Sequence, residues 1–215
     1  NEKMQEYIDQ GKLAGIITLV SRNNETVHFA AQGMQDKDAS KQMQRDTIFR
    51  IYSMSKPITT VAALKLWEQG KFHMNDPIAW YLPELANLKV YVSGSGENMV
   101  LEDVKSPIRI IDLFTHTAGF SYGFSGSEVD KMYRASPMLQ GKTLPENVLS
   151  ELAKLPLNHQ PGTQWNYGIS TDVIGFLVEK LSGMKLGEYV EQEILKPLGM
   201  DDTGFHVPAH KAHRL

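Results

Sequence analysis

Apolar and polar positions along the first fifty residues predict a short helix followed by a β-hairpin. Residues 2–11 favour the helix. An apolar run at 16–20 ends in the polar stretch 21–25, and apolar residues then alternate with polar ones over 26–31. Alternation with a period of two is typical of strands, and the polar link between the runs is turn-prone. We therefore expect two antiparallel strands here and a further short strand edge at 47–52.

The segment 55–69 is apolar on nearly all of its faces, with Ile58, Val61 and Leu66 among its apolar positions. A helix with this pattern is typically buried on every side. The sequence therefore predicts a central helix, which ends at Gly70 because glycine commonly terminates helices.

The second half of the chain favours helices by the same criteria. We expect them at 146–155 and at 171–181, where apolar residues recur on one stripe. Ser170 or Thr171 is expected to cap the later helix, and Gly183 to end it.

Two other stretches of this half carry a clear local signal. Residues 93–98 are rich in serine and glycine and predict a long turn or flexible insertion. Residues 203–207 predict a short strand. The overall order is strands first and then a long, mainly helical section, and a sheet of two strands is marginal by itself.

Composition narrows the classes of partner. The 215 residues carry 22 Lys and Arg against 25 Asp and Glu, a net charge of −3, so no basic field exists to hold nucleic acid or anionic lipid. The longest apolar stretches, 15–20 and 173–178, are about a third of the roughly 20 residues that a membrane-spanning helix needs. We expect neither a nucleic-acid partner nor a membrane span.

Metal and thiol chemistry have little support. The chain has no cysteine, which removes disulfides, thiol nucleophiles and thiolate metal sites. This usage slightly favours a cytoplasmic protein, although a periplasmic one whose leader has been removed also fits. His206, His210 and His213 lie close together and suggest a three-histidine metal site. Because Pro208 breaks any helix there, we favour a solvated tail and expect neither a metal nor an organic cofactor.

Candidate nucleophilic chemistry begins with Ser53-Met54-Ser55-Lys56, at the junction between the expected strand edge and the buried helix. A spacing of three on a helix places two side chains on the same face, one turn apart. A serine hydroxyl needs an adjacent base to become a nucleophile, and a neutral lysine amine can be that base. Its pKa must then fall by roughly 3 units from about 10.4.

The same string also has an ordinary interpretation. Ser53 can simply cap the helix while Lys56 lies in solvent, and a second copy, Ser182-Gly183-Met184-Lys185, straddles an expected helix end and fixes no geometry. From these residues alone, a functional role for Ser53 and Lys56 and a structural one are equally supported.

A second serine motif is Gly119-Phe120-Ser121-Tyr122-Gly123, which matches the Gly-x-Ser-x-Gly elbow of the α/β-hydrolases. That elbow needs a strand running into the turn and a helix leaving it, whereas both flanks here predict loop. Asp172 or Asp201 with His206 could complete the chain order. A glycine-rich turn is the favoured interpretation, and the Ser121 hydrolase stays a minor alternative.

Six segments of the chain carry a resemblance to a known family: 49–57, 70–77, 81–85, 113–120, 161–168 and 195–200. In this order they resemble the group that contains class C β-lactamases, penicillin-binding proteins and family VIII carboxylesterases. The first carries the Ser-x-x-Lys string, 113–120 is similar to the family's His-Thr-Ser-Gly turn, and 161–168 to its tyrosine motif. Ordered agreement over nearly the whole chain is far more specific than one tetrapeptide.

The resemblance implies a serine hydrolase that passes through an acyl-enzyme. Ser53 would be the nucleophile, and Lys56 would take or share its proton. Tyr167, otherwise an aromatic more easily explained by packing, would be the second general acid/base. The backbone N–H of Ser53 would supply one oxyanion donor, and the other would come from a strand that is not found in this chain.

The sequence departs from the family's pattern at two places. Ile169 replaces an asparagine that contacts the substrate amide in lactamases, and an apolar side chain cannot make that hydrogen bond. The third motif, a Lys or His before Thr or Gly and then Gly, has no match: Lys142-Thr143-Leu144 lacks the glycine, and His116 belongs to the earlier turn. For His116 itself, a general base and a residue tied into that turn both remain open.

The resemblance therefore implies an α/β (α+β) fold of the β-lactamase/transpeptidase type, with an antiparallel sheet flanked by helices and a mainly helical domain. We expect 1–69 to hold the first part of the α/β domain with the Ser-x-x-Lys helix, 70–200 the helical domain, and 201–215 a return towards the α/β domain. The chain is expected to be a fragment or to lack a C-terminal part, so its sheet should keep one edge and one face open for a further segment or chain.

The expected activity is hydrolysis of short-chain or aryl carboxylic esters. A β-lactamase or D-Ala-D-Ala carboxypeptidase is the alternative within the same class. A non-catalytic member of the fold that binds a ligand is the alternative from another class. In each case the partner would be a small ester, lactam or related molecule.

Overall fold

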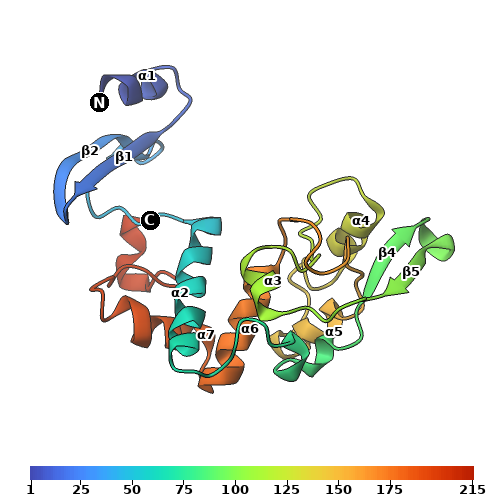
Figure 1. Cartoon of the computed structure of the whole chain (residues 1–215). Helices are drawn as coiled ribbons and strands as arrows, with labels where there is room; N and C mark the ends of the chain where they lie inside the picture. The colour runs from blue at the N-terminus through green and yellow to red at the C-terminus, as the bar shows by residue number, and fades with distance from the viewer. The chain divides into compact units, whose positions relative to one another are not determined.

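The computed structural model describes all of residues 1–215. It divides into two compact units, one formed by residues 1–52 together with 202–215, and the other by residues 53–201. Figure 1 labels the helices and strands of the two units.

The smaller unit contains the predicted hairpin. Helix α1 (Glu2–Asp9) is followed by β1 (Gly15–Arg22), β2 (Glu25–Asp36) and the short β3 (Lys41–Gln42), in an antiparallel sheet of order β1-β2-β3. Between β1 and β2, Asn23 and Asn24 have φ angles of 51° and 63°. Positive φ at both central residues is the signature of a two-residue turn that matches strand twist, so the hairpin prediction is confirmed, with α1 beside it in Figure 1.

The sheet of this unit is open, as predicted. Strand β1 lies at its edge and pairs only with β2. Leu19, Val20 and Val27 are each more than half exposed although they are apolar strand residues. An unpaired edge beside exposed apolar side chains is a surface on which further strands can pair.

Two predicted strands of this unit are wrong. Neither 47–52 nor 203–207 forms a strand. The backbone N–H of Ile48 donates instead to the carbonyl of Arg214, in the 3-10 helix η7 (Ala209–Arg214), at 2.7 Å. A strand needs a series of backbone hydrogen bonds to a neighbouring strand, and these residues have a single one instead.

The helix predicted at 55–69 forms in the larger unit. Helix α2 (Ser55–Glu68) contacts α6 (Ser170–Ser182) and α7 (Leu186–Val190), which continues as the π-helical turn η6 (Glu191–Leu195). The helix is buried on one side, but Val61 and Trp67 are 47% and 44% exposed. The prediction of its position is confirmed, and that of burial on all sides is wrong. No helix of the chain is long and apolar enough to span a bilayer.

Helix α6 confirms the prediction for 171–181, with one correction. Its N-cap residue is Ile169, so Ser170 and Thr171 lie inside the helix and are buried. Gly183 ends it in the left-handed conformation, with φ of 72°. Residues 146–155 also form a helix as predicted, although a short one in two parts.

A hairpin that the sequence analysis missed lies within the larger unit: β4 (Lys89–Ser93) pairs with β5 (Val100–Asp103) around the serine- and glycine-rich turn. The remaining elements of this unit are short helices. They are η2 (Ile78–Trp80), η3 (Pro83–Leu85), η4 (Gly96–Asn98), α3 (Ile110–Phe114), α4 (Glu128–Ala135), η5 (Pro145–Asn147) and α5 (Val148–Leu152).

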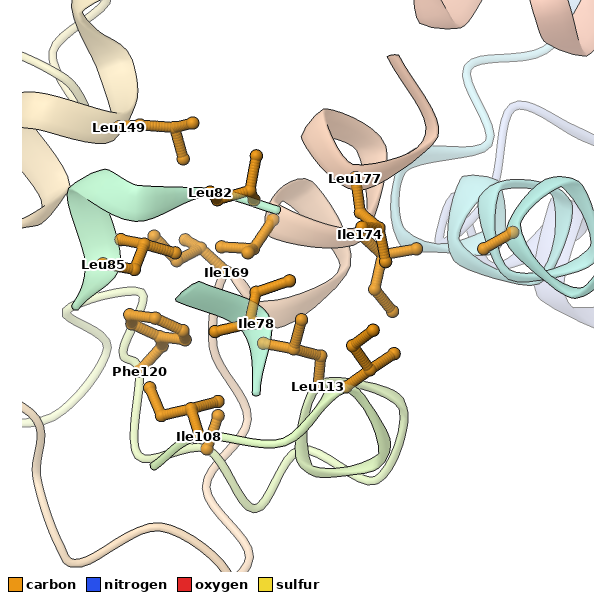
Figure 2. Packing of buried hydrophobic residues seen from close by; sticks show 14 of the residues in the cluster. Ile78, Leu82, Leu85, Ile108, Leu113, Phe120, Leu149, Ile169, Ile174 and Leu177 are labelled. Atoms are coloured by element: carbon orange, nitrogen blue, oxygen red, sulfur yellow. The ribbon is translucent and has the colours of Figure 1, made fainter. Parts of the chain in front are cut away.

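These elements share one hydrophobic core, shown in Figure 2. Ile174 and Leu177 of α6 point into it, and Phe120 and Ile169 bring loop residues to the same cluster. Each of these side chains is less than 5% exposed. Burial of a side chain of this size is worth roughly 1.5–3 kcal/mol, so the loops that carry the site are anchored by their own core residues.

Candidate active site

Ser53 and Lys56 lie where a 3-10 turn runs into a helix. The turn η1 (Tyr52–Met54) leads directly into α2, so Ser53 precedes the helix and Lys56 occupies its first turn. Pro57 fits at this point because the first N–H groups of a helix have no partner within it. Lys56 Nζ donates to Ser53 Oγ at 3.3 Å. The helix N-terminus adds a partial positive charge beside the hydroxyl.

Tyr167 reaches the same hydroxyl from the loop before α6. Its phenol OH lies 2.8 Å from Ser53 Oγ, across 114 positions of sequence. Two hydrogen bonds fasten the preceding residue to the turn after α3: the Asn166 N–H donates to the carbonyl of His116 at 2.8 Å, and the Asn166 Nδ2 to that of Phe120 at 2.6 Å. The three predicted residues thus come together around one oxygen atom.

Gly168 allows this loop to approach the turn closely. A Cβ added there would lie 2.2 Å from the carbonyl oxygen of Phe120 and 2.8 Å from the backbone nitrogen of Ser121. Both are backbone atoms that the core holds in place, so any side chain at this position would force the loop, and Tyr167 with it, away from Ser53.

We expect Gly168→Ala to lower the free energy of unfolding by about 1–3 kcal/mol, the usual cost of overpacking a fixed site. Urea denaturation measures the change. Gly126→Ala is the matched control, because a Cβ there meets nothing within 4 Å, and its effect should stay within about 0.5 kcal/mol. Equal midpoints for the two variants would contradict the close approach.

Lys56 lies close to two tyrosine rings of the site. Its Nζ lies 4.8 Å from the ring centroid of Tyr167 and 5.2 Å from that of Tyr122. Hydrogen bonding of the Tyr167 oxygen with Lys56, and then with Ser53, holds the pKa of this phenol below its usual value, against the opposing effects of partial burial and Asp172. A lowered pKa makes the phenolate, which is the base, more accessible near neutral pH.

The pKa of Tyr122 is shifted in the opposite direction to that of Tyr167. The Tyr122 OH donates to Asp172 Oδ2 at 2.8 Å. Burial, and then the charge of Asp172, raise the pKa of Tyr122. The two tyrosines therefore differ: Tyr167 is poised to exchange a proton, and Tyr122 stays a neutral ring beside the lysine. The sequence analysis did not link Tyr122 to Asp172, because residues 50 apart in the chain give no local signal.

Ser121 does not have the surroundings of a nucleophile elbow. Its side chain is only 3% exposed, donates to the carboxylate of Asp130 and accepts from the Gly123 N–H at 2.8 Å. Asp172, one acid considered for it, is bonded to Tyr122 instead. The side-chain partners of Ser121 are Asp130 and Gly123, so the histidine base of a Ser-His-Asp arrangement is missing.

The second Ser-x-x-Lys string is also structural. Ser182 is the last residue of α6, and its Oγ accepts from the backbone N–H of Met184 at 3.1 Å. The histidines 206, 210 and 213 are all exposed, and the chain contains no group of three or more His, Cys, Asp or Glu side chains arranged to hold a metal ion.

Comparison with known proteins places this site in context. A family model described as Beta-lactamase matches residues 1–215. Protein Rv1367c of Mycobacterium tuberculosis is 39% identical over 212 residues, covering 98% of this chain and 52% of the relative. Esterase EstB of Burkholderia gladioli is 34% identical over 205 residues, covering 93% of this chain and 49% of the relative.

Solved structures give the same result for the fold. The structure of EstCE1, described as a hydrolase with promiscuous acyltransferase activity, superposes with a TM-score of 0.80 at 29% identity, over 97% of this chain and 52% of that one. The arrangement of helices and small antiparallel sheets is therefore the one expected from the sequence. The chain spans about half the length of the curated relatives it matches.

Proposed function

Because this chain belongs to the beta-lactamase family of serine hydrolases, we propose that it hydrolyses carboxylic esters through an acyl-enzyme on Ser53, with short-chain or aryl esters as substrates. One observation carries the proposal: the Tyr167 OH and the Lys56 Nζ lie 2.8 Å and 3.3 Å from the same Ser53 Oγ. A hydroxyl with a proton acceptor within hydrogen-bonding reach is the arrangement that nucleophilic catalysis needs.

In the first step, Ser53 Oγ bonds to the ester carbonyl carbon while its proton passes to the Tyr167 phenolate. The negative charge then develops on the carbonyl oxygen, beside the N-terminus of α2. When the carbon–oxygen bond to the alcohol breaks, the alcohol leaves with the proton held by Tyr167. Lys56 stabilises the phenolate before and after the transfer.

In the second step, water attacks the acyl carbon, gives one proton to Tyr167 and releases the acid as Ser53 regains its proton. If an alcohol replaces water, the product is a new ester. We therefore propose acyl transfer as a side reaction, in keeping with the description of EstCE1 as a hydrolase with promiscuous acyltransferase activity.

Ester substrates are favoured over lactams by Ile169. This residue follows Tyr167 by two positions, where a polar side chain would contact a substrate amide, and it is 4% exposed within the core. It can offer neither a donor nor an acceptor, and a site without that hydrogen bond discriminates poorly in favour of amides. The name of EstB, an esterase, agrees with this preference.

The proposal is tested by labelling the intact protein with a fluorophosphonate and locating the adduct by mass spectrometry. We expect one phosphonylated residue, Ser53, and no label at Ser121 or Ser182. Heat-denatured protein is the control, since a reaction that survives unfolding does not report the site. Absence of any serine adduct on folded protein would favour the alternative of a non-catalytic, ligand-binding member of the family.

A further inference from the structure

His116 makes three contacts with Tyr167 and the residues on either side of it. Its carbonyl oxygen accepts the N–H of Asn166 at 2.8 Å, and its ring Nδ1 accepts the N–H of Gly168 at 3.5 Å. The rings of His116 and Tyr167 lie against each other, with centroids 5.1 Å apart. One residue thus accepts the backbone N–H groups of Asn166 and Gly168, the two neighbours of Tyr167, and packs against the Tyr167 ring.

The backbone of His116 is itself fixed in a special conformation. Its φ of 55° is in the left-handed region, which histidine adopts less easily than asparagine or glycine. The turn is held from behind, where the Thr117 N–H donates to the carbonyl of Asp112 at 2.8 Å. Asp112 is buried and paired with Arg109, whose terminal nitrogen lies 2.8 Å from its carboxylate. The turn that carries His116 is therefore itself held in place by hydrogen bonds.

The hydrogen bond to Gly168 requires one protonation state of the ring. Nδ1 can accept only when it carries no proton, so the neutral tautomer with hydrogen on Nε2 fits and the imidazolium does not. The charged groups acting on the ring are Lys56 of α2 and Asp172 of α6, and Tyr167 lies against it. Burial first, and then Lys56, lower the pKa of His116, while Asp172 opposes them.

We propose that His116, in its neutral form, is a positioning residue that holds Tyr167 within reach of Ser53, and that protonation of its ring releases Tyr167. This inference rests on the esterase function proposed above. His116 would touch neither substrate nor the reacting atoms, and would act only through the loop that carries Tyr167.

The direction of the pH effect follows from the charge state. The competent form of the ring is the unprotonated one, so activity should fall as pH decreases through the pKa of His116. Because that pKa lies below the ordinary value of 6.5, protonation of His116 should add a further fall of kcat below pH 6.5 to the one that follows ionisation of Tyr167.

Two substitutions distinguish loss of the hydrogen bond to Gly168 from loss of the ionisable ring of His116. In His116→Asn, the side-chain oxygen can take the place of Nδ1 as acceptor, asparagine tolerates the left-handed backbone, and nothing titrates. We expect kcat for a nitrophenyl ester near pH 8 to stay within about threefold of wild type, and the further fall of kcat assigned to His116 to disappear. His116→Leu removes the acceptor, and we expect kcat to fall by about 10–100-fold with little change in KM, as displaced catalytic groups do.

His73 offers a matched control. Its Nδ1 also accepts a backbone N–H, that of Asn75 at 3.3 Å, and its own backbone N–H donates to the Asp76 carboxylate at 2.7 Å. His73→Asn should therefore leave both kcat and its fall at acid pH unchanged. A fall of kcat below pH 6.5 in His116→Asn as steep as in wild type, or a kcat in that variant as low as in His116→Leu, would overturn the proposal.

A readout independent of turnover separates failure of this inference from failure of the esterase proposal. With tyrosines labelled at the ring carbon that bears oxygen, NMR follows ionisation of the Tyr167 phenol. We expect its lowered pKa to persist in His116→Asn and to move towards the ordinary value of 10.0 in His116→Leu. An inactive wild-type protein that shows this pattern would refute the esterase function alone, and an active one in which Tyr167 titrates identically in all variants would refute the role of His116 alone.

Discussion

Replacement of Ser53 by alanine is expected to reduce kcat/KM for a nitrophenyl ester by about 10³-fold or more, the scale on which loss of a nucleophile acts. Ser53 Oγ is the oxygen that is hydrogen-bonded to both Lys56 Nζ and Tyr167 OH. The variant therefore has no nucleophile at that position. Initial rates in the intact protein measure the effect. Its fold should be unaffected, since Ser53 is exposed.

Two further serines serve as controls for this variant. Ser121→Ala removes a buried donor to Asp130, so it should lower stability by about 1–3 kcal/mol while the activity of the folded fraction stays within a few-fold. Ser182→Ala changes the duplicate Ser-x-x-Lys string and should alter neither. Loss of activity in Ser121→Ala, with Ser53→Ala still active, would contradict the assignment of the nucleophile.

Lys56→Met is expected to lower kcat by about 10²–10⁴-fold, because it removes the group that stabilises the Tyr167 phenolate and so weakens the general base. The side chain donates to Ser53 and is the main reason for the low pKa of Tyr167. Without the ammonium, the pKa of Tyr167 should rise and the phenolate should become scarce near neutral pH. The kcat of the variant should therefore increase with pH over a range in which that of the wild type is already level.

Lysine at position 185 provides the control, because it has the same sequence spacing from a serine but lies beyond the end of α6. Lys185→Met should keep the wild-type rate and pH profile. A Lys56→Met variant whose kcat is reduced but whose pH profile matches the wild type would show that the lysine acts on Ser53 without setting the ionisation of Tyr167.

The elements that could be predicted from the sequence are those with strong local signals. The hairpin of β1 and β2 carries alternating residues around a turn-forming Asn-Asn pair, and α6 carries an apolar stripe that ends in glycine. The strands expected at 47–52 and 203–207 failed because short apolar runs form strands only when a partner is in register beside them. That partner is a non-local property, which periodicity does not encode.

The same difference between local and non-local signals applies to the residues of the candidate site. Ser53 and Lys56 are three residues apart where a 3-10 turn enters a helix, so the spacing made contact one of two equally supported interpretations. Tyr167 could be named only through the resemblance to a family, because its approach to Ser53 depends on a glycine and on a turn 50 residues earlier. The bond between Tyr122 and Asp172 was foreseen by neither route.

The burial of Ile169 links substrate choice to the integrity of the fold. To acquire an amide side chain at this position, the protein would have to place unpaired polar groups among Ile78, Leu82 and Phe120 of the core (Figure 2), at a cost of roughly 1–3 kcal/mol. A mutational path from ester towards lactam recognition would thus begin with a loss of stability, and the intermediate sequences would need compensating substitutions elsewhere before the new hydrogen bond could be selected.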